Sequence, residues 1–162
     1  MILVMLGTQN NSFQRLLEEI DTLMDKHVIQ EEVVVQAGYT KYSPRNKKMR
    51  ILDFTSKEEL DKLEQEANFI ITHGGVGSII TSLEKGKKVI AVSRLHEYGE
   101  HVNNHQKEIV QKFNDNGNII GITSVEKLEE AIKQIQDFEP KPYIPDNHKM
   151  LKIIEEFIDH IN

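Results

Sequence analysis

The chain has 162 residues, of which 38% are hydrophobic, and a formal net charge of −6. This length fits one domain that buries a core without disulfide or metal support. The acidic balance argues against a nucleic-acid partner, and the lack of cysteine excludes disulfides, zinc–thiolate sites and thiol nucleophiles.

The first predicted element is the apolar segment Ile2–Leu6. It is too short to span a membrane, and it lacks the cationic start of a signal peptide. We interpret it as a buried strand and expect a cytoplasmic protein. Any position at the inner face of a membrane would then come from a partner.

Short apolar runs alternate with longer, helically periodic segments over residues 1–138. The predicted strands, rich in Val and Ile, are Ile2–Leu6, Glu32–Gln36, Arg50–Phe54, Asn68–Thr72, Lys88–Val92 and Asn118–Gly121. The predicted helices are residues 13–24, Lys57–Glu66, Val76–Lys85, His101–Asn114 and Glu126–Gln136. This alternation predicts a Rossmann-like α/β domain, a parallel sheet of about six strands with helices on both faces.

Two serines are expected to cap helices. Ser12 precedes the first helix, and Ser56 precedes the second with Glu59 three residues on, a capping-box pattern. Basic residues gather between Arg45 and Arg50, next to Pro44. A solvated loop is the simpler interpretation of this run, and a contact with a partner or an anionic lipid is the alternative.

Residues 139–146 contain three prolines and are predicted to form an extended, stiff linker. They separate the domain, residues 1–138, from a last helix over residues 147–162. That helix either packs back on the domain or contacts another subunit.

Ligands of parallel α/β sheets bind at the carboxyl ends of the strands. The first strand ends in Gly7-Thr8, without the G-x-G-x-x-G of a dinucleotide fold or the phosphate loop of an NTPase. A Gly-Thr pair permits a tight turn with exposed amides and a hydroxyl. It is therefore either a simple turn or part of a binding site.

The fourth strand ends in His73-Gly74-Gly75-Val76-Gly77-Ser78, where a helix is predicted to begin. Glycines allow close backbone approach, and the free amides and dipole of a helix N-terminus favour an anion. We expect this segment to hold a diphosphate, with the Ser78 hydroxyl as a further donor. A flexible strand-to-helix turn is the alternative.

The fifth strand leads into a polar segment, residues 93–106, which contains Arg94, Asn104, His105 and Gln106. Amide and imidazole groups suit sugar hydroxyls, which donate and accept hydrogen bonds. An exposed polar loop is one alternative. A metal site is another, formed by His96, His101 and His105, although no carboxylate is clearly placed to complete it, so we expect no bound metal.

Three motifs together resemble the C-terminal domain of family 28 glycosyltransferases. They are His-Gly-Gly-x-Gly-Ser at 73–78, Leu-Glu-Lys-Gly-Lys at 83–87, and Gly-Glu-His-Val-Asn-Asn-His-Gln at 99–106. The chain is most similar to short members that form one half of a two-subunit enzyme. Such members include bacterial exopolysaccharide and capsule subunits and the cytosolic subunit of the dolichol-linked UDP-GlcNAc transferase.

The resemblance implies one half of a GT-B enzyme that binds a UDP-sugar and inverts the anomeric centre without a cofactor. A membrane-associated partner would carry the acceptor site, and the acceptor would be a polyprenyl-diphosphate-linked saccharide in exopolysaccharide or capsule biosynthesis. Residues carried over by position are Gly7 and Thr8 at the cleft, Gly74, Gly75, Gly77 and Ser78 at the diphosphate, and Asn104, His105 and Gln106 at the sugar.

One position departs from the family pattern. Many relatives have Glu or Asp three residues after the serine of the glycine-rich motif, where it holds the ribose, and this chain has Thr81. Thr81 forms weaker hydrogen bonds than a carboxylate, and Glu84, one turn further on, is the alternative.

The chemistry requires a general base for the acceptor hydroxyl. The sequence offers His73, Glu100 and His101 as candidates, and the partner is a further source. Arg94 is an additional candidate contact for the donor. The alternative function is a non-catalytic nucleotide-sugar-binding or stabilising partner of a membrane glycosyltransferase.

Overall fold

The computed structural model describes residues 1–100 and 105–144. Within them, six parallel strands form one sheet in the order β3-β2-β1-β4-β5-β6. The strands are β1 (Ile2–Met5), β2 (Val33–Gln36), β3 (Met49–Leu52), β4 (Phe69–Thr72), β5 (Val89–Val92) and β6 (Ile120–Ile122). This architecture confirms the predicted Rossmann-like fold.

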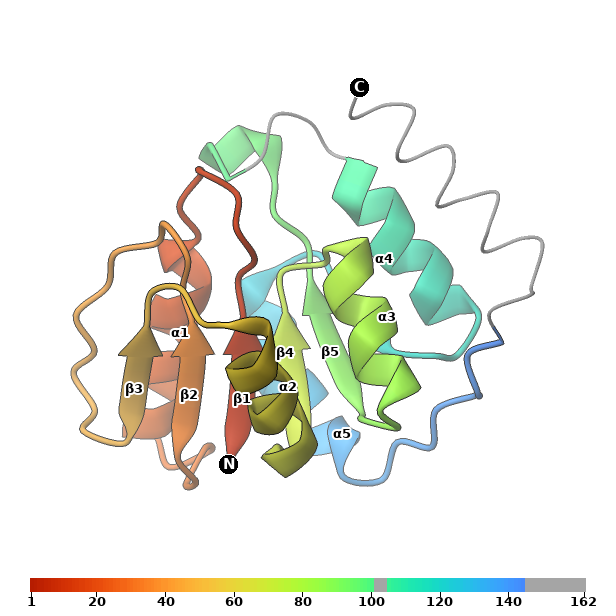
Figure 1. Ribbon diagram of the computed structural model, residues 1–162, viewed down its shortest axis with the longest axis horizontal. Helices are drawn as coiled ribbons and strands as arrows, with labels where there is room; N and C mark the ends of the chain where they lie inside the picture. Colours follow the sequence, from red (N-terminus) through yellow and green to blue (C-terminus); the bar gives the residue numbers. More distant parts are fainter. Residues whose placement is uncertain (101–104, 145–162) are drawn as a thin grey trace.

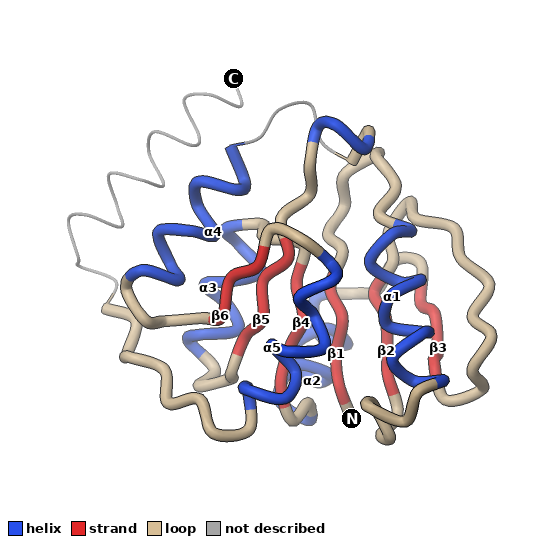
Figure 2. The backbone as a smooth tube through the Cα atoms, turned by 180° about the vertical axis from the view of Figure 1, so that it is seen from behind, coloured by secondary structure: helices blue, strands red, loops and turns tan. Residues whose placement is uncertain are grey.

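Helices cover both faces of the sheet. They are α1 (Gln14–Asp25), α2 (Lys57–Glu66), α3 (Val76–Glu84), α4 (His105–Asp115) and α5 (Leu128–Ile135), with short 3-10 turns η1 (His96–Tyr98) and η2 (Val125–Lys127). Figure 1 shows α2, α3 and α4 on one face, and Figure 2 shows α1 and α5 on the other. No helix of the described part is both long and apolar enough to cross a membrane.

The strand order reverses at β1, which lies between β2 and β4. The ladder pairs Met5 with Gln36 on one side and with Thr72 on the other, so these three strands end level with one another. A crevice outside the carboxyl ends of the strands at such a reversal is where open α/β sheets bind ligands. The Gly7 turn and the His73–Ser78 segment therefore meet at this point.

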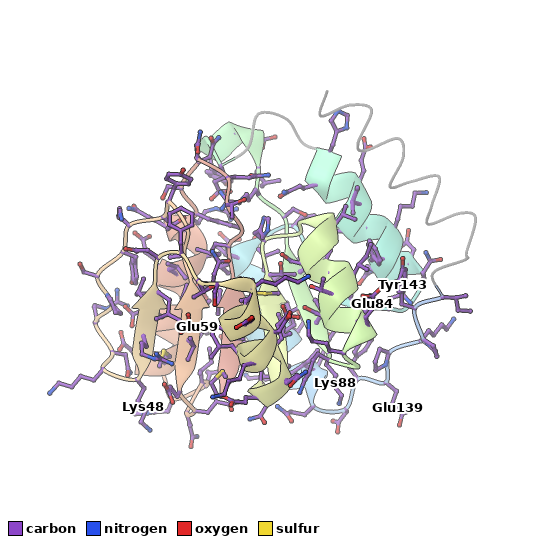
Figure 3. All side chains as sticks on the ribbon, in the orientation of Figure 1. Lys48, Glu59, Glu84, Lys88, Glu139 and Tyr143 are labelled. Carbon is purple, nitrogen blue, oxygen red and sulfur yellow. The ribbon has the colours of Figure 1, made fainter. Side chains whose placement is uncertain are left out.

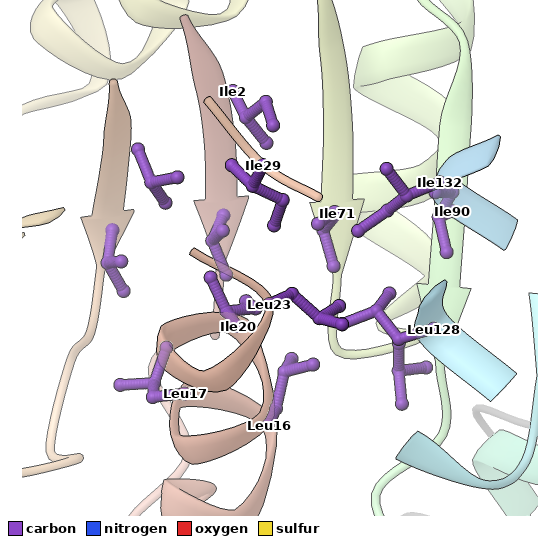
Figure 4. Close-up of a cluster of buried hydrophobic side chains, with 14 of the residues drawn as sticks. Ile2, Leu16, Leu17, Ile20, Leu23, Ile29, Ile71, Ile90, Leu128 and Ile132 are labelled. Atoms are coloured by element: carbon purple, nitrogen blue, oxygen red, sulfur yellow. The ribbon is translucent and has the colours of Figure 1, made fainter. Parts of the chain in front are cut away.

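The core is divided by the sheet. On one face, α1 and α5 pack on the strands through Leu16, Leu17, Ile20, Leu23, Leu128 and Ile132 (Figure 4). On the other face, Leu63 of α2 packs on β1, β2 and β4, and Ile79 of α3 with Ile109 of α4 packs on β5. The strand β1 is buried along its whole length, as a central parallel strand is expected to be.

One of the two expected serine caps is observed. The Ser56 hydroxyl accepts a hydrogen bond from the Glu59 amide at 3.1 Å, and α2 has its predicted bounds. The helix α1 begins at Gln14 with Phe13 as its N-cap, so the expected cap at Ser12 is wrong. A distant residue explains the difference, because the Phe13 amide donates to the Thr40 hydroxyl at 3.0 Å.

Lysines after α3 close the ends of two other helices. The Lys87 ammonium donates to the carbonyls of Gln65 and Ala67 at the end of α2. Lys88 donates to the carbonyls of Ile135 and Gln136 at the end of α5, on the other face of the sheet (Figure 3). Cations at helix C-termini satisfy free carbonyls and the helix dipole. Lys87, the last residue of the motif at 83–87, and the adjacent Lys88 therefore have structural roles.

The basic side chains of the run Arg45–Arg50 are exposed, as the solvated-loop interpretation requires, whereas Met49 is buried and, with Arg50, belongs to β3. The first residue of the run contacts α1. The Arg45 guanidinium lies 3.0 Å from the Asp25 carboxylate. The fully buried Asp21 carboxylate accepts from the Tyr42 hydroxyl at 2.7 Å and from the Arg45 and Asn46 amides. Burial and the hydrogen bond to Asp21 raise the pKa of Tyr42 to about 12.

The described part of the proposed linker lies against the domain. The Lys141 amide donates to the Gly117 carbonyl at 2.8 Å, and the Asn118 side chain donates to the Lys141 carbonyl at 3.0 Å. The Tyr143 ring packs on Phe113 of α4 with centroids 6.3 Å apart. The predicted last helix, residues 147–162, lies outside the described residues.

We expect Asp21→Asn to lower the free energy of unfolding by about 2–4 kcal/mol, because a buried charge acceptor for three donors is lost. Urea denaturation measures this change. Asp25→Asn is the matched control, since Asp25 also pairs with Arg45 but is half exposed. An equal loss in both variants would contradict the role given to Asp21.

Candidate functional site

The carboxyl ends of β1 and β4 meet around the imidazole of His73. A Cβ atom added to Gly7 would lie 2.6 Å from its Nε2 atom, and one added to Gly75 would lie 2.6 Å from its Cε1 atom. The ring is 5% exposed and lies between these two glycines. Both positions therefore require glycine for this packing, and Gly7 requires it again because its φ is 73°.

The turn at Gly74 is pressed against α4. Gly74 has a φ of 84°, and a Cβ there would lie 2.8 Å from Val110 and 3.8 Å from the Gln106 amide oxygen. Gln106 is 1% exposed, and its amide oxygen lies 3.4 Å from the Arg94 backbone nitrogen that donates to it. The predicted sugar contact Gln106 thus lies beneath the turn in this structure.

The N-terminus of α3 opens toward solvent. Gly75 is its N-cap and provides no side-chain hydrogen bond. The first amides of the helix, at Val76, Gly77 and Ser78, have no acceptor within the helix. A Cβ added to Gly77 would meet no atom of the described residues within 4 Å, and Gly77 is exposed, so the described residues leave open space beside it. Free amides, the helix dipole and open space together suit an anion of diphosphate size.

The structure separates the two candidates for the ribose. Thr81 is exposed, and its hydroxyl donates to the Ser78 carbonyl at 3.3 Å, so both residues share a face near the start of α3. Glu84 is the last residue of the helix, roughly 12 Å from its first residue. Figure 3 shows Glu84 beside Tyr143, away from the glycine turn. This position favours Thr81 over Glu84.

Gln36, the last residue of β2, and Gly38, two residues further on, also shape the site, and neither was predicted as a site residue. The Gln36 side-chain amide donates to the Gly7 carbonyl and accepts from the Gly7 amide, both at 3.1 Å. Gly38 packs directly on the Gly7 carbonyl. Gln36 is the one polar residue of an otherwise apolar strand, and this was the available signal.

An exposed aromatic pair lies at the same edge of the sheet. Tyr39 follows β2 and Phe54 follows β3, and they are 52% and 55% exposed. Their ring centroids are 5.0 Å apart in an edge-on arrangement. Each is an ordinary loop residue in the sequence, so only the fold pairs them. Exposed aromatic faces at a ligand edge suit the stacking of a flat base.

Arg94 has a different position from the one expected of a donor contact. It is 1% exposed, and its guanidinium donates to the carbonyls of Leu6, Asn11 and Glu100. Burial lowers its pKa to about 10, which leaves the group charged at neutral pH. The structure therefore assigns Arg94 to holding loops, because its charged end does not reach solvent.

The candidate bases differ in availability. The Glu100 carboxylate is 3% exposed and is held by Arg15 through two hydrogen bonds, at 2.9 and 3.0 Å, which leaves it poorly placed to take a proton. His73 borders the glycine turn. His101 and Asn104 lie outside the described residues, and His105 is 31% exposed, 3.7 Å from Glu108. Residues 1–100 and 105–144 contain no group of three potential metal ligands.

We expect Arg94→Lys to lower the free energy of unfolding by about 2–4 kcal/mol, because a lysine ammonium cannot replace the planar guanidinium group, which donates to three carbonyls. Thermal or urea denaturation of the ligand-free protein measures it. Arg50→Lys, at an exposed position, is the control. Unchanged stability of Arg94→Lys would instead favour a direct donor contact.

Comparison with known proteins places the chain in a family. Residues 1–161 match the glycosyltransferase family 28 C-terminal domain. The UDP-N-acetylglucosamine transferase subunit ALG13 of Candida glabrata is 30% identical over 123 residues, which are 74% of this chain and 57% of that protein. The ALG13 subunit of Mus musculus is 36% identical over 67 residues, 41% of this chain and 5% of that protein.

Solved structures show the same fold. The NMR structure of ALG13 matches with a TM-score of 0.60 at 18% identity, covering 94% of this chain and 93% of that one. The UDP-GlcNAc 2-epimerase of Methanocaldococcus jannaschii, in complex with UDP-GlcNAc and UDP, matches at 0.60 and 16% identity, covering 98% of this chain and 45% of the epimerase. The calicheamicin glycosyltransferase CalG4 matches at 0.60 and 15% identity, covering 99% and 37%.

The chain thus corresponds to one Rossmann-like half of these larger molecules, and it spans only part of the Candida glabrata and mouse proteins it matches. The likeness in fold and the match over residues 1–161 agree with the three motifs around the glycine turn. The chain belongs to the glycosyltransferase family 28 C-terminal domain family.

Proposed function

We propose that this chain is the donor-binding subunit of a two-component, inverting, UDP-sugar-dependent hexosyltransferase. The observation that carries the proposal is the glycine-capped N-terminus of α3, which opens at the point where the strand order reverses. Its free amides and open space offer a diphosphate site that needs no metal. Membership of the family supplies the reaction class.

The donor is proposed to lie along the carboxyl edge of the sheet. The diphosphate would contact the amides of Val76, Gly77 and Ser78, and Thr81 would hold the ribose. The Tyr39–Phe54 pair would receive the uracil ring by stacking. Since the ALG13 relatives are UDP-N-acetylglucosamine transferase subunits, UDP-GlcNAc is the donor to test first.

The reaction requires charge stabilisation at the leaving group. An acceptor hydroxyl attacks the anomeric carbon, the bond to the diphosphate oxygen breaks, and that oxygen keeps the electron pair. The amides of α3 would stabilise the resulting charge. Because Arg15 holds Glu100, we propose that the base belongs to the partner or is His73 or His101.

The partner is proposed to be a membrane-associated protein that provides the other half of the GT-B cleft and the acceptor site. The Candida glabrata relative is named a subunit of a UDP-N-acetylglucosamine transferase, which supports a second component. A polyprenyl-diphosphate-linked saccharide is the proposed acceptor, in exopolysaccharide or capsule biosynthesis. Through this partner the chain would lie at the inner face of the membrane.

We expect Gly77→Asp to weaken UDP binding about 10- to 100-fold, because two charges about 4 Å apart repel by roughly 1–4 kcal/mol. Isothermal titration calorimetry measures the affinity. Gly77→Asn is the matched control, with the same shape and no charge. An acidic residue in the first turn of a helix is favourable, so Gly77→Asp should still fold. Equal affinity in the two variants would place the diphosphate elsewhere.

Reconstitution tests the enzyme itself. When the chain and its membrane partner are combined, they should transfer GlcNAc from UDP-GlcNAc, or another hexose from a panel of UDP-sugars, to a lipid-linked saccharide. Omission of either subunit should abolish transfer. UDP binding without transfer of any sugar would favour the alternative, a non-catalytic nucleotide-sugar-binding partner. Absence of UDP binding would reject both functions.

A further inference from the structure

Two loops that flank the glycine turn are joined although their strands do not touch. The strands β1 and β5 are the two neighbours of β4 in the sheet. From the loop after β5, the Arg94 guanidinium donates to the Leu6 carbonyl at 2.7 Å and to the Asn11 carbonyl, both after β1. In the opposite direction, the Asn11 side chain donates to the Gly99 carbonyl at 3.0 Å. These bonds pass across the end of β4.

An ion pair between a partly buried arginine and a buried glutamate strengthens the same connection. Glu100, at the end of the loop after β5, is 2% exposed, and Arg15 in the first turn of α1 binds both of its carboxylate oxygens at 2.9 and 3.0 Å. The Leu95 amide donates to the same carboxylate at 3.1 Å. Two-point binding of this kind fixes orientation as well as distance.

Aromatic rings complete the arrangement on both sides. The Arg15 guanidinium lies 4.4 Å from the centroid of Tyr98 and 5.6 Å from that of Phe13. The Arg94 guanidinium lies 5.2 Å from the same Phe13 ring. Phe13 is fully buried at the start of α1. Two cations and one carboxylate are therefore packed together between the loops.

We propose that Arg15 is a positioning residue for the donor: through its pair with Glu100 it holds the loops after β1 and β5 together on either side of the glycine turn. The loop after β1 contains Gly7, which packs on His73, and the Arg94 backbone amide donates to the Gln106 side chain beneath Gly74. Without the pair, the walls of the turn are free to separate. This inference rests on the proposed function, because it assigns the site to a UDP-sugar.

The experiment compares three variants of the chain. They are Arg15→Met, Arg15→Lys and a charge-swapped double variant that combines Arg15→Glu with Glu100→Arg. Hydrogen–deuterium exchange of the ligand-free protein is followed in residues 7–13 and 93–100, with β2 and α2 as internal references. Calorimetry with UDP then gives the affinity of each variant. Arg50→Met is the matched control, because Arg50 also forms an ion pair, with Glu32, but both side chains are more than half exposed.

We expect Arg15→Met to speed hydrogen–deuterium exchange about tenfold or more in both loops, because one pair of charge-assisted hydrogen bonds is lost. Exchange in the reference elements should be unchanged. Its UDP affinity should fall at least about fivefold, and the charge-swapped double variant should recover part of this affinity. Arg15→Lys should resemble Arg15→Met, because an ammonium lacks the two-point fork. If Arg15→Met does not fold, Arg15→Lys alone decides these comparisons.

Wild-type exchange in both loops of Arg15→Met and Arg15→Lys would overturn the proposal. So would faster exchange with unchanged UDP affinity, which would leave Arg15 a purely structural residue. Full affinity in Arg15→Lys but not in Arg15→Met would also overturn it, since that result indicates direct contact of a cation with the ligand. Failure of the wild-type protein to bind UDP rejects the proposed function instead, while the exchange measurement still reports on the link between the loops.

Discussion

Close packing of backbone around one buried imidazole is the constraint on which the site depends. The His73 ring fills the space between Gly7 and Gly75, so the ends of β1 and β4 pack around this one side chain, with no Cβ atom at either glycine. Gln36 and Gly38 hold the Gly7 turn from the other side. This packing leads the chain directly into α3, whose first amides have no acceptor within the helix, and a helix N-terminus of this kind suits an anion.

Buried charges give the loops their positions. Asp21, Arg94 and Glu100 are each at most 2% exposed. Asp21 and Arg94 bind backbone atoms of loops far away in the sequence, and Glu100 binds the distant Arg15 side chain and the nearby Leu95 amide. Burying a charge is costly unless every partner is present, so such residues penalise alternative loop arrangements. The loops around the glycine turn are thereby held by polar contacts, while the sheet beneath them is held by apolar packing.

Apolar side chains are buried on both faces of the sheet, whereas several aromatic side chains are exposed at its carboxyl edge. This distribution is the one expected of a protein that provides half of an active site. Three large exposed hydrophobic side chains lie at the carboxyl edge of the sheet: Tyr39 and Phe54 on loops, and Tyr98 in the 3-10 turn η1. The glycine turn lies at this edge too. A second half placed against it would meet both the proposed diphosphate site and the aromatic side chains, which is the arrangement that the proposed transfer reaction needs.

The sequence by itself determined the fold class, the six strands to within a few residues, and the glycine-rich turn, because period and glycine content are local properties. It also identified the family through three motifs. It failed at the Ser12 cap, where Thr40 competes from a distant loop. Only the tertiary structure decided that Arg94 is buried, that Gln36 holds Gly7, that Tyr39 meets Phe54 and that Arg15 holds Glu100. These contacts join residues far apart in the chain. The sequence shows neither whether such a side chain is buried nor which distant residue it contacts.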